Sequence, residues 1–409
     1  MIRTVRLQLF GWLGLPAMCL LLLSCNDAPS IVGSELIPGT DSLYTASSAT
    51  LPLLTGDTTT IAELPLVNSS YFLLGSTRSA EARLFCEILR FPAEVLGDSA
   101  FSDTTFDVSS ANLQLYPQNY AVGDTADRLM SFKVYDLKKF WAADVTWDSI
   151  WNGADVSEYY ATTDKPIATY SEPLASVVPD STVINIPFDQ ATVKRWLVDS
   201  RDTAKLKKIY GFAIVPSGMK QIRQFRNIAS AAQKMRLRVI VRSRRDTATQ
   251  IISLESTVAS FVNDADPQPT SLTIQGSRNV KFRLTTQLDS IPPRAVVMGG
   301  DLKMTLDQTA SVLGTSGRDQ KISLRYQPPT GQPIVIESSD DSSGVYRFRN
   351  IGPLIDLIRR HRKPATLTFQ ATGGNEFWTM NRLVFHATTA LPALRPRLTF
   401  IYTVPPEKK

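Results

Sequence analysis

The sequence predicts an all-β protein built from two tandem antiparallel β-sandwich domains of the jelly-roll kind, each with one short helix. Many short segments alternate apolar and polar residues, which is typical of half-buried strands. Frequent Pro, Gly, Asn and Asp residues separate these segments and favour turns. A set of four separated sequence blocks also occurs twice along the chain, which indicates that one domain has been duplicated.

Three of the duplicated blocks have the alternation of strands. They pair residues 83–88 with 283–288, residues 111–115 with 300–304, and residues 235–241 with 396–402. The fourth block predicts a helix in each copy, with Asp189 and Asn350 as the N-cap residues. Its apolar spacing predicts two equivalent buried stripes, namely Val193, Trp196 and Leu197 in the first copy and Leu354, Leu357 and Ile358 in the second.

Residues 1–24 have the features of a bacterial lipoprotein signal peptide. Arg3 and Arg6 precede a long apolar run, and the small residue Ser24 stands directly before Cys25. We therefore expect cleavage before Cys25 and acylation of its thiol, which would anchor the mature chain in a membrane. An ordinary secretory peptide and an uncleaved helix are the two alternatives for this segment.

The expected organisation has four parts. Residues 1–24 form the signal peptide, 25–45 the lipidated N-terminus and tether, 46–245 the first β-module and 246–409 the second. The tether is expected to hold the first module off the membrane. Residues 242–269 are interpreted either as a flexible joint or as the start of the second module. Cys86 is left without a cysteine partner in the mature chain, so no internal disulfide is expected.

Net charge argues against nucleic acid as a partner. The whole chain carries +6, and removal of a leader that holds two basic residues and no acid leaves +4. Such a balance is too small for the dense basic surface that nucleic-acid binding requires. The expected partners are therefore the membrane, through Cys25, and either a glycan or an envelope protein.

Two resemblances add to this interpretation. The segment 31–38 follows the lipidation motif directly and is itself followed by Phe72-Leu73-Leu74-Gly75-Ser76. This combination resembles a Bacteroidota family of surface lipoproteins described as a domain of unknown function, and the resemblance implies a location at the outer membrane. It covers the first half of the chain.

The second resemblance rests on aromatic blocks. Residues 140–147 contain Trp141 and Trp147, and they are followed by the helix with Trp196 and by a strand at 210–214. This succession resembles the DNRLRE-type jelly-roll modules of exported bacterial proteins, some of which bind acidic polysaccharides. The second copy lacks the Trp-rich block, so the resemblance supports the fold more than the ligand.

Residue types that carry catalysis are scarce. His361 and His386 are the only histidines, and neither has carboxylates at ligand spacing, so no metal, cofactor or catalytic triad is expected. The segment 340–344, Asp-Asp-Ser-Ser-Gly, is interpreted as a polar hairpin turn rather than a calcium site, since the EF-hand spacing is absent. A pair of glycosidase carboxylates would leave no sequence signature.

Two groups of residues are candidates for ligand binding. Lys234, Arg236, Arg238 and Arg242 alternate with apolar residues, which places their cations on one strand face. That face could meet anionic glycans or phosphates, or it could be an ordinary solvated surface. Trp141 and Trp151 could stack on sugar rings or lie in the core, whereas Trp147, Trp196 and Cys86 are assigned to the core.

The preferred hypothesis is a non-catalytic, membrane-anchored envelope lipoprotein whose two β-modules recognise a polysaccharide. A structural or assembly lipoprotein is the first alternative, and it predicts an exposed apolar patch. A polysaccharide-active enzyme is the second, and it predicts paired carboxylates in a groove.

Overall fold

The structure is a computed structural model. It describes residues 42–61, 65–88, 91, 105–142, 144–152, 156–227, 233–264, 272–319, 321–340, 343–372 and 378–405. The expected signal peptide, Cys25 and most of the expected tether lie outside the described residues, as do two residues of the expected 340–344 turn. The predictions for these segments remain predictions.

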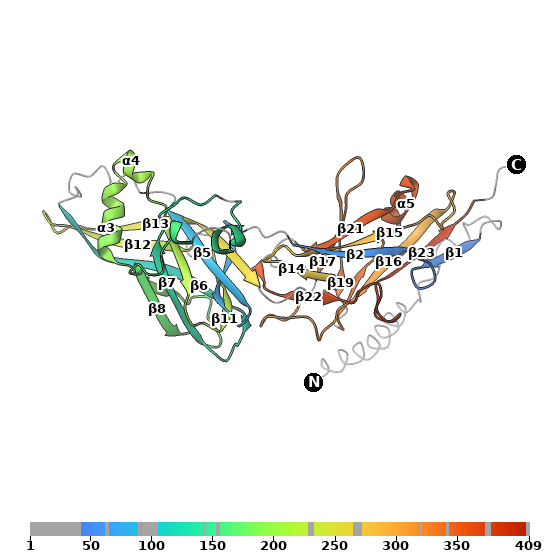
Figure 1. Ribbon diagram of the computed structural model, residues 1–409, viewed down its shortest axis with the longest axis horizontal. Helices are drawn as coiled ribbons and strands as arrows, with labels where there is room; N and C mark the ends of the chain where they lie inside the picture. Colours follow the sequence, from blue (N-terminus) through green and yellow to red (C-terminus); the bar gives the residue numbers. More distant parts are fainter. Residues whose placement is uncertain are drawn as a thin grey trace, which may run out of the picture.

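The all-β prediction is confirmed. Figure 1 shows two strand-rich units placed end to end along the long axis of the molecule. The N-terminal unit contains β3 (Leu66–Val67), β4 (Tyr71–Ser76), β5 (Ala80–Ile88), β6 (Phe106–Gly123), β7 (Leu129–Asp136), β8 (Ala168–Pro173), β9 (Ile184–Pro187), β10 (Phe212–Pro216), β11 (Gln221–Arg226), β12 (Arg236–Ser243) and β13 (Thr249–Asp264). Its helices are α3 (Gln190–Asp199) and α4 (Thr203–Leu206), with shorter turns at Asp148–Asn152 and Val156–Glu158.

Two long strands organise the N-terminal unit. The first half of β6 pairs with β12 and its second half with β11, while β13 pairs first with β12 and then with β5. Since β4 joins β11 to β5, the described strands β13, β12, β6, β11, β4 and β5 form a closed hydrogen-bonded ring. Strand pairing therefore runs continuously around this unit, and a closed ring leaves few exposed edges.

The C-terminal unit contains two five-stranded sheets, in the orders β1-β23-β16-β20-β19 and β18-β17-β21-β15-β2, and the separate pair β14-β22. Its strands are β1 (Leu43–Ser47), β2 (Leu54–Thr60), β14 (Leu272–Gln275), β15 (Lys281–Thr286), β16 (Val296–Thr305), β17 (Ile322–Tyr326), β18 (Ile334–Glu337), β19 (Ser339–Asp340), β20 (Val345–Phe348), β21 (Ala365–Ala371), β22 (Arg382–Phe385) and β23 (Arg397–Thr403). Both sheets contribute to one buried cluster, beneath α5 (Gly352–His361).

The strand pairing divides the chain differently from the expected boundaries at residues 45/46 and 245/246. Strands β1 and β2, at the start of the described chain, pair with β23 and β15 of the C-terminal unit. Strand β13, expected in the second module, forms a hairpin with β12 of the N-terminal unit. Ala46 and Leu53, in and after β1, are buried in the C-terminal core. The first segment of the chain is thus an integral part of the last unit.

The register of the strands supports the internal duplication. In the N-terminal unit Leu237 of β12 lies opposite Leu113 of β6, and in the C-terminal unit Leu398 of β23 lies opposite Leu302 of β16. These are the residues that the sequence blocks aligned. The third strand beside this pair is β13 in one unit and β1 in the other. In the N-terminal unit, β13 follows β12 along the chain and pairs with it. In the described part of the C-terminal unit no later strand pairs with β23, and β1 takes the equivalent position beside it.

The helices agree in part with their predictions. Asp189 caps α3, accepting the backbone N–H of Thr192 at 2.9 Å, and Val193, Trp196 and Leu197 are buried as expected. In the second copy the N-cap is Ile351 rather than Asn350, because Asn350 lies at φ 57° and the helix begins at Gly352, with Pro353 in its first turn. Ile355 replaces Leu357 in the buried stripe. The N-terminal unit also has α4, a second helix that was not expected.

Within the described residues, no helix is long and apolar enough to cross a membrane.

Candidate functional site: a basic groove on the C-terminal unit

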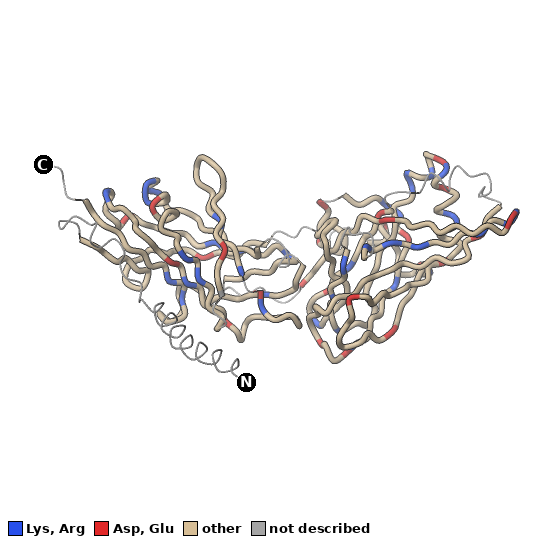
Figure 2. Tube along the Cα trace, turned by 180° about the vertical axis from the view of Figure 1, so that it is seen from behind, with Lys and Arg blue, Asp and Glu red and all other residues tan. Residues whose placement is uncertain are grey.

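An open groove of about 920 Å³ lies on the sheet that contains β15, β17 and β21. Its cationic lining residues are Arg283, Arg325 and Lys363, and His361 also lines it. We call this surface the basic groove. Figure 2 shows basic residues on neighbouring strands of this unit. The described lining residues include no Asp or Glu, so the groove presents positive charge alone.

The strands place two guanidinium groups in one row. Arg283 of β15 and Arg325 of β17 both lie opposite Thr368 of the intervening strand β21. Neighbouring strands are about 4.8 Å apart, so the two arginine Cα atoms are separated by about 10 Å across the sheet. Both side chains are exposed, while Phe282 and Leu284 on the opposite face of β15 are buried. The alternation of the strand therefore directs the cations outward.

Hydroxyl groups border these cations. Thr58 of β2 lies opposite Arg283, and Thr60 lies opposite Lys281, which is one alternation further along the same face. Thr366 and Thr368 of β21 also line the groove. A threonine hydroxyl both donates and accepts hydrogen bonds. The groove thus combines fixed positive charge with uncharged polar groups.

Like charges in this cluster repel one another. Burial lowers the pKa of the Lys281 ammonium, and the nearby Arg325 and Arg283 guanidinium groups lower it further. Neither arginine forms an ion pair with another described residue. Since an acidic neighbour would relieve this repulsion, the arrangement fits a site whose negative charge arrives with a ligand.

Sequence reasoning missed this groove. The signal was present in Lys281-Phe282-Arg283-Leu284, which has the same alternation of cations and apolar residues as the segment beginning at Lys234. Arg325 lies more than forty residues further along the chain, and only the pairing of β15 and β17 with β21 brings it beside Arg283.

The predicted cationic strand face exists, but its groups are partly engaged. Met235, Leu237, Val239 and Val241 are buried, so the alternation in β12 is confirmed. Lys234 forms an ion pair with Glu255 at 2.7 Å, and Arg236 donates to Gln114 Oε1 at 2.9 Å. Strand β12 lies between β6 and β13, so these cations do not protect a sheet edge. Arg238 is partly exposed and Arg242 is exposed, without ion pairs to described residues.

The aromatic candidates lie in a cluster around Phe85. Trp141 is 3% exposed and packs edge-on against Phe85 and Phe261, so the structure places it in the core. Trp151 is half-buried and stacks obliquely on Trp147 at 4.3 Å between ring centroids.

The guanidinium group of Arg83 lies over the indole rings of Trp147 and Trp151. Its central carbon is 4.9 Å from the centroid of the Trp147 ring and 5.0 Å from that of the Trp151 ring. The Trp151 ring also donates its N–H to the hydroxyl of Tyr160. The indole faces are therefore already occupied by protein groups rather than presented to a sugar.

Two further predictions concern reactive groups. Cys86 is fully buried beside Leu84, and burial raises the pKa of its thiol well above the ordinary value, which fits the expected core role. Among the described residues, no group of three His, Cys, Asp or Glu side chains is arranged to hold a metal ion.

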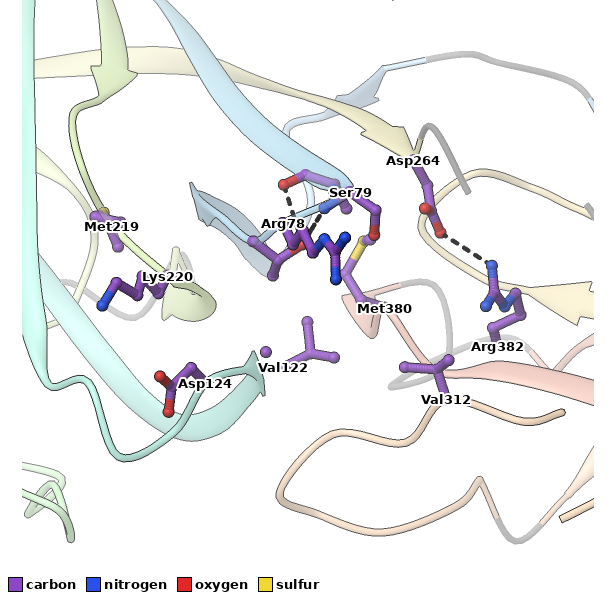
Figure 3. Close-up of a pocket in the computed structure, with 13 residues that line it drawn as sticks. Arg78, Ser79, Val122, Asp124, Met219, Lys220, Asp264, Val312, Met380 and Arg382 are labelled. Carbon is purple, nitrogen blue, oxygen red and sulfur yellow. Dashed lines mark hydrogen bonds and ion pairs between the residues drawn. The ribbon is translucent and has the colours of Figure 1, made fainter. Parts of the chain in front are cut away.

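A second cavity, of about 410 Å³, lies where the two units meet. Figure 3 shows Arg78, Asp124 and Lys220 of the N-terminal unit facing Val312, Met380 and Arg382 of the C-terminal unit. Its charges are largely balanced within the protein, because Arg382 lies 3.8 Å from Asp264 and Lys220 lies 3.6 Å from Asp127. This balance distinguishes it from the basic groove.

Direct contacts fix the two units on each other beside this cavity. Thr315 and Ala121 exchange two hydrogen bonds, in which the Thr315 N–H donates to the Ala121 carbonyl at 2.8 Å and the Ala121 N–H donates to Thr315 Oγ1 at 2.9 Å. The ring of Tyr71 packs on Trp378 at 4.9 Å. Met380 joins a small apolar cluster with Tyr120 and Val122. The units therefore share a packed interface.

Comparison of the sequence with models of known protein families and with curated proteins found no match.

Proposed function

We propose that this protein is a non-catalytic lipoprotein of the cell envelope, anchored in the outer membrane through Cys25, that recognises an acidic polysaccharide with the basic groove. The two units act as β-sandwich modules of the jelly-roll kind. The observation that carries the proposal is the row of Arg283 and Arg325, two exposed cations on one face without carboxylates in the lining of their groove.

The geometry favours a polymer over a small ion. The groove is open, and its cations are spread over two strands and the segment that follows α5 rather than converging on one point. A guanidinium group binds a carboxylate through two parallel hydrogen bonds. Uronic acid residues along a chain would supply such carboxylates at intervals, and the threonine hydroxyls would bind the neighbouring sugar hydroxyls.

The experiment is a binding titration of the purified protein with polygalacturonate and with a neutral glucan. We expect the double variant Arg283→Gln/Arg325→Gln to lose most of its affinity for polygalacturonate, with a weaker dependence on salt. The matched control is Arg238→Gln/Arg242→Gln, which removes one partly exposed and one exposed cation from the N-terminal unit. Equal losses in both double variants would show non-specific attraction, and unchanged binding in the first would overturn the proposal.

The anchor needs a separate test. Metabolic labelling with a fatty acid should mark the wild-type chain and not the Cys25→Ala variant. Protease added to intact cells then reports the side of the membrane. Digestion of both units supports surface display, whereas protection of a lipidated chain places them in the periplasm and favours an assembly role.

The two alternative functions make different demands. An enzyme acting on polysaccharide needs paired carboxylates near its substrate, and the lining of the basic groove supplies none. An assembly lipoprotein needs an exposed apolar patch, and such a patch is present at the far end of the C-terminal unit.

A further inference from the structure

Five large apolar side chains are exposed at one end of the C-terminal unit. They are Leu43, Tyr44, Val296, Met298 and Ile401, with exposed fractions between 43% and 59%. We call this group the apolar tip. Single exposed apolar residues are ordinary on protein surfaces, but several of them at one end of a sheet indicate a contact surface.

Strand register places these residues at the same end of one sheet, where Leu43, Val296 and Ile401 share a face. Leu43 of β1 and Val296 of β16 both lie opposite Thr403 of the strand between them. Tyr44 lies opposite Tyr402 in the next row, on the other face of the sheet end, and their rings stack at 5.4 Å. Ile401 occupies the third row, beside the bulge in β16 that contains Met298. The tip thus spans three neighbouring strands over three residue rows.

The N-terminal chain leaves the unit at this same place. Leu43 begins β1, and only seventeen residues separate it from Cys25. A fully extended chain of that length spans at most about 60 Å. The chain reaches the N-terminal unit only after β1 and β2 have crossed the C-terminal unit, where they pair with β23 and β15.

We infer that the apolar tip docks on the lipid surface that holds the anchor, so that the C-terminal unit stands next to the membrane and the N-terminal unit is displayed outward. This inference rests on the proposed acylation of Cys25. It reverses the order expected from the sequence, in which the tether holds the first module nearest the membrane.

Cations near the tip suit such a surface. The last turn of α5 carries Arg359 and Arg360, and both guanidinium groups form ion pairs with the single carboxylate of Asp356, which leaves this turn with a net positive charge. Arg359 donates to the carbonyl of Pro293, which precedes Val296 by three residues. Apolar side chains beside basic ones are the combination by which proteins rest on a bilayer that contains anionic lipids.

The test uses the full lipidated chain in vesicles of phosphatidylethanolamine with a minor fraction of phosphatidylglycerol. A fluorescent label is placed on Met298→Cys at the tip or on Val177→Cys, a position that is 74% exposed in the N-terminal unit. The buried Cys86 thiol does not compete for the label. We expect a nitroxide-bearing lipid to quench the label at 298 several-fold more strongly than the label at 177.

Two variants separate docking from simple proximity. Ile401→Glu adds a charge at the tip and should reduce quenching of the 298 label, while Val335→Glu, on an exposed side chain of β18, should leave it unchanged. Equal quenching at positions 298 and 177 would overturn the inference.

Flotation of the same vesicles reports the anchor separately. A chain that does not float with them refutes the acylation, and the inference falls with it. A floating chain without preferential quenching refutes the docking alone and leaves the tip as a protein contact, as the assembly alternative requires.

Discussion

The hydroxyl of Tyr120 in the N-terminal unit donates a hydrogen bond to Oδ1 of Asn381 in the C-terminal unit, at 3.2 Å. The same hydroxyl accepts the backbone N–H of Met380 at 2.6 Å. The Asn381 amide in turn donates to the carbonyl of Gly317 and to Oδ1 of Asp319. Since Tyr120, Met380 and Asn381 are all buried, this continuous polar network joins the units in a place that water does not readily enter.

Removal of the Tyr120 hydroxyl tests the network. We expect Tyr120→Phe to lower the free energy of unfolding by about 1–3 kcal/mol, because the Met380 N–H and the Asn381 carbonyl oxygen lose a buried partner. Urea denaturation followed by fluorescence measures this difference. Tyr170→Phe is the control, since the Tyr170 hydroxyl makes a long contact with Glu172 at a more exposed site. Equal effects of the two substitutions would contradict a special role for Tyr120.

Asp319 makes the interface sensitive to pH. Burial raises the pKa of its carboxyl from 3.8 to about 6, although the Asn381 and Thr379 side chains partly oppose this shift. A raised pKa in the folded chain means that folding favours the protonated form. The stabilising contribution is complete below the unfolded-state pKa and is lost as the pH rises through about 6.

We therefore expect the free energy of unfolding to be larger at about pH 5 than at about pH 8, and Asp319→Asn to flatten this difference by about 1–3 kcal/mol. Chemical denaturation across the pH range measures it. Asp107→Asn is the control. Hydrogen bonds from Arg244 and Lys194 lower the pKa of the Asp107 carboxyl to about 2, so this group titrates at a lower pH than Asp319. If the D319N variant keeps the full change in the free energy of unfolding between about pH 5 and about pH 8, another group is responsible for that change.

Gly211 occupies a position that only glycine fits. Its φ is +92°, and an added Cβ would lie 1.8 Å from the carbonyl oxygen of Cys86 on the neighbouring strand. We expect Gly211→Ala to destabilise the N-terminal unit by about 4 kcal/mol or more, through backbone strain combined with steric overlap. The control is Gly218→Ala, at φ +74° with open space around it, which should cost only about 1 kcal/mol. Thermal unfolding distinguishes the two.

Ala46 tests the assignment of β1 to the C-terminal unit. This side chain is 1% exposed and lies in the C-terminal core, opposite Phe400 of β23. We expect Ala46→Asp to abolish amide protection in β23 and β16 while β12 and β6 keep theirs, because a buried carboxylate disrupts only the core that contains it. Hydrogen exchange with mass spectrometry measures each strand. Thr45→Asp, at the exposed neighbouring position, should leave both units protected.

Much of the local structure could be predicted from the sequence. The alternation in residues 235–241 predicts a strand with Leu237 and Val239 buried, and both are buried. The pattern beginning at Asp189 predicts a capped helix with Trp196 inside, and the cap and the burial are both present. These features depend on residues within a few positions of one another, whose spacing alone decides which face is apolar.

The neighbours of each strand depended on the tertiary structure. Strand β1 pairs with β23 although more than 350 residues separate them, and β13 pairs back onto β12 across the expected domain boundary. Alternation shows that a strand has a buried face, but any strand of matching pattern satisfies its hydrogen bonds. Consequently the sequence could predict a repeated module without showing which segment completes each copy.

The two groups of cations differ for the same reason, because contacts between distant segments decide which cations have partners. Lys234 to Arg242 are adjacent in sequence, so their shared face was visible there, yet Glu255 and Gln114 engage two of them from other strands. Arg283 and Arg325 are distant in sequence and become neighbours only across β21. By itself the sequence determined that this is a β-protein with cationic and apolar strand faces. The tertiary structure decided which cations remain uncompensated and which unit receives the N-terminal chain, because both depend on contacts between segments far apart in sequence.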